Sequence, residues 1–157
     1  MNVLLDRTGE VTSLLEAKRR LPDEAAAALA REELDSYVNS TARSLRNGLL
    51  GLEHAARLDA AESVPYLLTT IFALEARVRP FNKYLEAELR ERPLAEPAWA
   101  ADTLLPQLAA AVAPGPAVQH ALFREVERAA RAGGLGDVID SWEPDVAWLR
   151  GEAPYRG

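Results

Sequence analysis

One polar cluster in the sequence has the spacing of a single helix face. Asn39, Arg43 and Arg46 follow one another at intervals of four and three residues, so in a helix they point the same way. Amide and guanidinium groups on one face can donate hydrogen bonds to a polar or phosphorylated ligand. A solvated helix face carries the same residue types, because charged side chains are normally exposed. The spacing leaves a binding face and a solvated face as equal alternatives.

A second polar cluster surrounds an expected helix start at Pro80. It consists of Arg77, Arg79, Asn82 and Lys83. The backbone N–H groups and the dipole at a helix N-terminus favour anions, so these side chains form a candidate anion-binding site. The alternative is ordinary ion pairing between helices, with the carboxylates of Glu75, Glu86 or Glu88.

The usual signatures of a self-contained active site are missing from the sequence. His54 and His120 are the only histidines, and neither has the glutamate three positions earlier that a di-iron bundle needs. The sequence contains no His-Glu-x-x-His zinc motif, no glycine-rich phosphate loop and no Gly-x-Ser-x-Gly elbow. It has no cysteine either, which excludes disulfides and thiolate sites. We expect no metal site, no cofactor and no catalysis by this chain alone.

Length and composition predict one globular domain over residues 1–157, with 48% hydrophobic and 27% charged residues. The formal net charge of −6 argues against general binding to nucleic acid or to anionic membranes. Charged residues appear too early for a signal peptide, and no apolar run approaches the roughly 20 residues of a membrane span. The expected location is cytoplasmic.

The N-terminal part is expected to be extended and then helical. Residues 2–5 form a short apolar run, closed by the turn-forming residues 6–9, which predicts a strand. Val11, Leu14 and Leu15 then predict a helix over residues 10–21, which Pro22 ends.

The longest predicted helix covers about residues 29–57. Its apolar stripe recurs every three to four residues and comprises Leu34, Val38, Leu45, Leu49, Leu52 and Ala56. A second, smaller and more polar stripe comprises Tyr37, Ser40, Ser44, Gly48 and Gly51. This stripe predicts either the close approach of another helix or the lining of a polar groove.

An apolar helix follows, and its start has two candidate caps. Asp59 and Glu62 have capping-box spacing, whereas Pro65 suits only a first turn, which favours Ser63 as the cap. Further helices are predicted over residues 81–91 and 102–113, then after a loop at 114–116 up to about residue 132, and, as short helices, over 137–142 and 145–149. The chain is therefore predicted to be an all-α, up-and-down bundle of five or six main helices, with a short N-terminal extended segment. Six aromatic residues are expected in the core or an interface: Phe72, Phe81, Tyr84, Trp99, Trp142 and Trp148.

Two stretches of the chain carry a family resemblance. The first is residues 34–40 with 43–47, and the second is residues 56–63 with 77–85. Together they resemble the C-terminal helical, substrate-binding region of bacterial nucleotidyltransferases related to kanamycin nucleotidyltransferase. Residues 3–10 resemble the last strand and exit turn of the catalytic domain of such proteins. By this resemblance, residues 1–9 are a remnant of that domain and residues 10–157 are the helical bundle.

The resemblance implies a binding role in a nucleotidyltransferase. The family's catalytic domain carries Gly-Ser followed by Asp-x-Asp, and this sequence has neither. The nucleotide triphosphate and its Mg²⁺ are therefore expected on a partner catalytic domain, on a separate chain or lost, while this chain holds a small polar acceptor. The resemblance also implies that Glu62 is a candidate general base, although the capping box explains it too. The expected groove residues are Tyr37, Asn39, Arg43, Tyr66 and Arg79.

Two other functions stay open on the sequence alone. A stand-alone protein could form a homodimer or dock a partner through the small residues Ser44, Gly48 and Gly51. A helical RNase of the toxin type would need Arg and His separated by four to six residues. Arg46 and His54 have seven residues between them, which disfavours that alternative.

Overall fold

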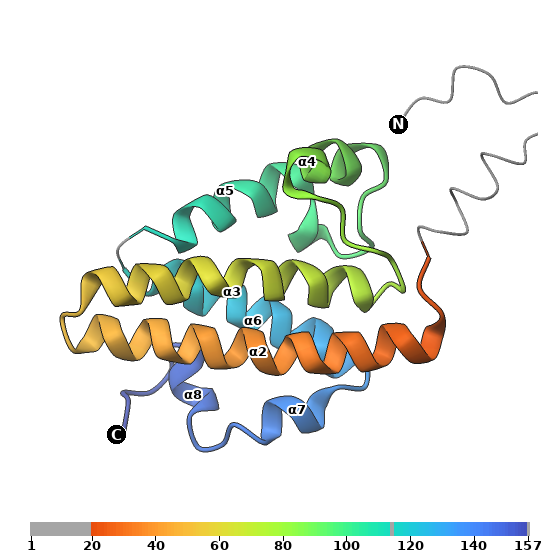
Figure 1. Cartoon of the computed structure of the whole chain (residues 1–157). Helices are drawn as coiled ribbons and strands as arrows, with labels where there is room; N and C mark the ends of the chain where they lie inside the picture. The colour runs from red at the N-terminus through yellow and green to blue at the C-terminus, as the bar shows by residue number, and fades with distance from the viewer. Residues whose placement is uncertain (1–19, 114, 157) are drawn as a thin grey trace, which may run out of the picture.

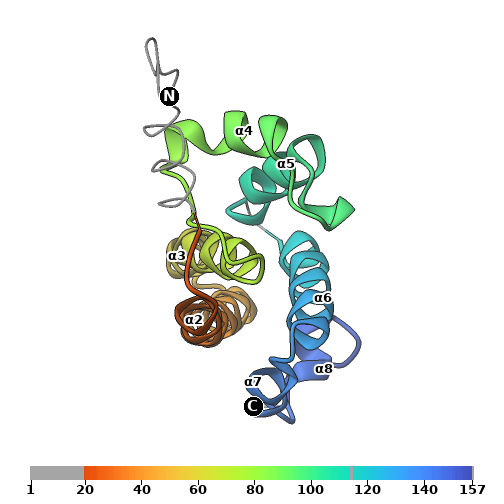
Figure 2. The same ribbon diagram turned by 90° about the vertical axis from the view of Figure 1, so that its right-hand side faces the viewer.

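The computed structural model describes residues 20–113 and 115–156, and this part of the chain is all-helical, as predicted. Two long antiparallel helices form one layer of the molecule: α2 (Asp23–Leu49) and α3 (Glu53–Ala73). Figures 1 and 2 show the other elements behind this hairpin and along its two edges. They are α4 (Asn82–Glu91), the 3-10 turn η1 (Pro97–Trp99), α5 (Ala101–Ala111), α6 (Ala117–Ala132), α7 (Gly136–Asp140) and α8 (Val146–Leu149). The strand and helix predicted within residues 2–21 lie almost entirely outside the described residues.

One hydrophobic core connects these helices. Leu34 of α2, Phe72 of α3, Leu104 of α5, Phe123 of α6 and Ile139 of α7 are all completely buried. Helix α6 packs behind the α2–α3 hairpin because its apolar side chains recur at helical spacing along one side. The outer face of α2 and α3 is left without another described helix over it (Figure 2).

The long helix predicted over residues 29–57 is wrong at both ends. Helix α2 begins at Asp23, immediately after Pro22, and ends at Leu49. Gly51 follows with a φ of +71°, a left-handed conformation that glycine adopts without steric cost. The N–H of Leu52 then donates to the carbonyl of Asn47 (2.9 Å), and the N–H of Gly51 donates to that of Gly48 (3.1 Å). These two bonds form a Schellman motif, which ends the helix.

Helix α3 begins earlier than predicted. Its first residue is Glu53, so neither Asp59 nor Ser63 caps it, and the capping box predicted for Asp59 and Glu62 is wrong. Pro65 lies inside the helix and not in its first turn. The hydroxyl of Thr69 donates to the Pro65 carbonyl (2.9 Å), so the backbone around this proline keeps a local hydrogen bond.

Several predicted core residues are exposed. Leu49 and Leu52 are 64% and 51% exposed, because the chain turns between them. Phe81 (82% exposed) and Tyr84 (53% exposed) are also outside the core. The predicted burial of Phe72, Trp99 and Trp148 is confirmed, and Trp142 is half-buried.

The remaining helices agree with their predicted ranges to within one or two residues. Phe81 precedes α4, and α6 ends at Ala132 before Gly133, as the Gly-Gly pair indicates. The described chain enters the bundle beside the end of α3, where Arg20 forms an antiparallel bridge with Arg77. The N–H of Leu21 donates to the Ala76 carbonyl there (2.8 Å).

Candidate functional site

A network of charged and amide side chains joins α2 to α3 on the outer face of the hairpin. The Arg43 guanidinium binds Asp59 through Nε (3.1 Å) and Nη2, and binds Glu62 Oε2 through Nη2 (2.5 Å). Asn47 Nδ2 donates to the other oxygen of Asp59 (2.7 Å). Asp59 is therefore fully engaged and only 13% exposed, and its role is to hold Arg43 in place.

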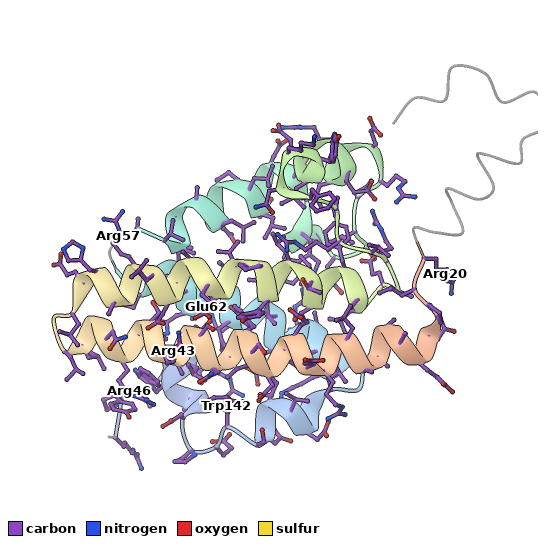
Figure 3. All side chains as sticks on the ribbon, in the orientation of Figure 1. Arg20, Arg43, Arg46, Arg57, Glu62 and Trp142 are labelled. Carbon is purple, nitrogen blue, oxygen red and sulfur yellow. The ribbon has the colours of Figure 1, made fainter. Side chains whose placement is uncertain are left out.

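Glu62 carries the carboxylate of this network that stays accessible to a ligand. Its side chain is 44% exposed, and one carboxylate oxygen is bound to Arg43 (Figure 3). The other oxygen, Oε1, accepts no hydrogen bond from the described residues. A carboxylate in this state can accept a proton from a bound hydroxyl group while Arg43 fixes its orientation.

The three side chains predicted to share one face of α2 separate in the structure. Arg43 turns to α3, whereas the Arg46 guanidinium lies 5.2 Å from the ring centre of Tyr155 near the C-terminal end. Asn39 is exposed on α2. Figure 3 shows Arg43 against the hairpin and Arg46 beyond the edge of α2. The helical spacing was therefore correct, but the long arginine side chains reach different neighbours.

The two tyrosines predicted to line a groove have different environments. Tyr37 is only 2% exposed and belongs to the core, so its predicted place in a groove is wrong. Burial raises the pKa of its phenol, which stays neutral. Tyr66 is half-buried and lies on α3 one helical turn after Glu62. Tyr66 therefore stays a candidate groove residue beside the outer face of the α2–α3 hairpin.

Arg77 is used to connect elements of the chain. Its guanidinium donates to Glu88 (2.7 Å) and to the carbonyls of Arg92 (2.8 Å) and Pro93 (3.3 Å), and it lies over the Phe72 ring at 5.2 Å. Only 17% of the side chain is exposed. Arg77 therefore forms the ion pair between elements that the sequence analysis gave as the alternative to anion binding.

Arg79 lies half-buried at the opposite end of the hairpin from the α2–α3 turn. It donates to Asn82 (2.6 Å), but its buried Nε has no hydrogen-bond partner among the described residues. Burial lowers the pKa of the guanidinium, and Glu33 of α2 partly opposes this shift. Lys83 stays exposed, with its ammonium 4.6 Å from the Tyr84 ring centre. The four residues predicted to form one anion site therefore divide into a structural Arg77 and a group near the start of α4.

An open hollow of about 780 Å³ adjoins this group. Arg79 and Asn82 border it, together with the exposed apolar side chains of Val78 and Phe81 and with Leu21, where the described chain enters. Exposed apolar side chains rimmed by polar groups are typical of a binding region.

A smaller cavity lies at the other end of the bundle, near the α2–α3 turn. Sequence analysis did not identify it, because its walls come from α2, α3, α6 and the region of α8. Glu53, Arg57, Gln119 and His120 are its main polar residues. Two of the small residues predicted for a dimer contact, Ser44 and Gly48, also line this cavity. Ser44 is buried and donates to the Ala56 carbonyl (2.8 Å), and Gly48 lines the cavity.

The described residues lack the groupings that two other kinds of site would need. Within residues 20–113 and 115–156, no three His, Asp or Glu side chains are grouped so as to hold a metal ion. None of the described helices combines the length and apolar character that a membrane crossing requires. Comparison of the chain with protein-family models, curated proteins and solved structures finds no significant match.

Proposed function

We propose that this chain is the helical acceptor-binding part of a nucleotidyltransferase and works with a catalytic domain outside the described residues. The observation that carries the proposal is the Arg43–Glu62 pair on the uncovered outer face of α2 and α3. Asp59 and Asn47 fix the arginine, while Glu62 keeps one free carboxylate oxygen. Tyr66 offers an adjacent partly buried ring against which an acceptor can pack.

The proposal divides the reaction between two parts, this chain and a catalytic domain. Nucleotide triphosphate and Mg²⁺ would be bound by that domain, whose family motif supplies the carboxylates for the metal. The acceptor would then lie along the outer face of the hairpin, between the two parts.

The proposed chemistry assigns Glu62 a single step. The acceptor hydroxyl oxygen bonds to the α-phosphorus of the nucleotide, and the bond from that phosphorus to the leaving pyrophosphate breaks. Glu62 takes the proton that the hydroxyl loses, and Arg43 holds the carboxylate in its orientation. The net charge of −6 also suits an acceptor that carries amino groups.

The test is nucleotidyl transfer by a fusion protein. The chain is joined after a nucleotidyltransferase catalytic domain of this class and incubated with Mg²⁺, α-labelled ATP and a panel of small amino- and hydroxyl-bearing acceptors. We expect a labelled acceptor. Because general-base catalysis contributes roughly 10²–10⁴-fold, Glu62→Gln should lower kcat at least about tenfold.

A matched substitution separates this role from general effects of charge. Glu32 is an exposed carboxylate of the same hairpin, on α2, so Glu32→Gln should leave kcat unchanged. If no acceptor in the panel is labelled, or if Glu62→Gln and Glu32→Gln behave alike, the proposed role is rejected. Circular dichroism of both variants verifies that the helical fold is kept.

A further inference from the structure

The cavity near the α2–α3 turn forms a second site, separate from the outer face of the hairpin. Its volume is about 280 Å³. Ordinary ligand pockets span roughly 300–1,000 Å³, so this cavity fits a metabolite of amino-acid size and not a larger molecule. Leu45, Ala60 and Trp148 supply much of its apolar wall. The ligand therefore needs a compact apolar part.

Gln119 places an unused acceptor at the cavity wall. The residue is only 8% exposed. Its Nε2 makes a long hydrogen bond to the Ala111 carbonyl (3.4 Å), whereas Oε1 is buried and accepts no hydrogen bond from the described residues. A buried carbonyl oxygen without a donor is unfavourable, and a ligand N–H group in the cavity would satisfy it.

His120 lies beside Gln119 on the same wall. Its Nδ1 lies 2.8 Å from the carbonyl oxygen of Leu149. Because a carbonyl can only accept, Nδ1 carries a proton and donates to it, which fixes the ring against the region of α8. Gln119 and His120 are adjacent on α6, and the unused oxygen of Gln119 calls for a ligand that donates a hydrogen bond.

Two opposite charges complete the lining. Glu53 and Arg57 lie one turn apart on α3, a spacing at which glutamate and arginine often pair. Here neither forms an ion pair with any described residue, and Arg57 Nε donates only to the Val112 carbonyl (3.3 Å). An anion can therefore bind Arg57 while a cation binds Glu53.

We propose that this cavity binds a free α-amino acid with an apolar side chain. Its ammonium group would donate to the Glu53 carboxylate and to Gln119 Oε1, and its carboxylate would bind the Arg57 guanidinium. The side chain would pack against Leu45 and Trp148. A zwitterion is the class of ligand that matches one unused acceptor, two opposite charges and one apolar wall together.

Isothermal titration calorimetry of the full chain tests the proposal with leucine, phenylalanine and tryptophan. Two phenylalanine analogues probe the polar groups: 2-phenylethylamine lacks the carboxylate and 3-phenylpropanoate lacks the amine. We expect saturable one-to-one binding of at least one amino acid, and at least about tenfold weaker binding of both analogues, because each leaves a buried or charged partner unmatched. No saturable binding up to millimolar concentrations overturns the proposal, and so does equal binding of either analogue.

Two variants identify the site of binding. A Cβ at Gly48 meets no atom within 4 Å, so Gly48→Leu places a side chain at the cavity wall without a clash at Cβ, and it should abolish binding without lowering Tm. Ala28→Leu, at an exposed position of the same helix, is the control and should bind normally. Gln119→Leu removes the unused acceptor and should weaken binding at least about tenfold without lowering Tm. Unchanged affinity in either cavity variant overturns the assignment.

The site and the proposed transferase role can fail independently. The calorimetric experiment uses this chain alone and needs no catalytic domain. Glu62→Gln, which changes the outer face of the hairpin, should leave amino-acid binding unchanged. Loss of amino-acid binding in this variant contradicts a cavity site separate from that face.

Discussion

Arg77 shows at the scale of one residue how a cation can look like a ligand-binding group and yet hold the chain together. Arg77→Met keeps an apolar stem over Phe72 but removes every guanidinium donor. Glu88 keeps Arg92 as a partner, whereas the hydrogen bonds to the carbonyls of Arg92 and Pro93 are lost. We expect the free energy of unfolding to fall by about 2–3 kcal/mol, measured by urea denaturation and circular dichroism.

An exposed arginine provides the control for this change. Arg90 lies on α4 and pairs with Glu86 and Asp102, but its side chain is 52% exposed. Arg90→Met should therefore destabilise the protein much less than Arg77→Met, because exposed ion pairs contribute little. Equal losses for Arg77→Met and Arg90→Met would contradict the structural role of Arg77.

At the scale of the elements, two glycines near the α2–α3 turn should respond in opposite directions to the same substitution. Gly51 has a φ of +71°, so Gly51→Ala forces an L-residue into a left-handed conformation and should destabilise the protein by about 1–2 kcal/mol. Gly48 lies inside α2 with open space around its Cβ position, so Gly48→Ala should stabilise by up to about 1 kcal/mol. Differential scanning calorimetry measures both changes. An unchanged or raised Tm for Gly51→Ala would show that the Schellman turn does not depend on Gly51, and a lowered Tm for Gly48→Ala would contradict the open space at its Cβ position.

The same turn explains why some element boundaries were predictable and this one was not. Pro80 and the pair Gly133-Gly134 interrupt the apolar pattern. The predicted start of α4 and the predicted end of α6 agree with the structure to within one or two residues. Leu49 and Leu52 continue the helical spacing of α2 across Gly51, although both are exposed. Apolar spacing indicates which residues are on one side of a helix, but it cannot tell a continuing helix from one that folds back.

The candidate sites were less predictable than the fold, because side chains from distant segments meet in them. The sequence identified Glu62 and Arg43 separately, but their contact depends on the register of α2 against α3. Gln119 and Arg57 have no motif in common, and only the packing of α6 behind the hairpin brings them to one cavity. Spacing within one helix carries no information on such contacts.

At the scale of the whole molecule, stability in acid should depend on Glu127. This carboxylate of α6 is 7% exposed and binds Arg150, which follows α8, and Arg131 (2.8 Å). The hydrogen bonds from Arg150 lower its pKa, burial opposes them, and Arg131 adds to the lowering. Because the folded pKa lies below the unfolded value of about 4.3, the stabilisation is complete above that value and is lost as pH falls through the folded pKa.

Glu127→Gln should therefore destabilise the protein by about 2 kcal/mol at pH 7, and this difference from the original protein should shrink as the pH falls below about 4. Urea denaturation at a series of pH values measures both effects. Glu125→Gln, on the same helix but in an exposed pair with Arg128, should change the free energy of unfolding by less than about 1 kcal/mol. A Glu127→Gln difference that stays constant down to pH 3 would mean that the carboxylate is not what joins α6 to the end of α8. The loss at pH 7 would then come from packing, since only an ionised carboxylate in the folded state makes the difference depend on pH.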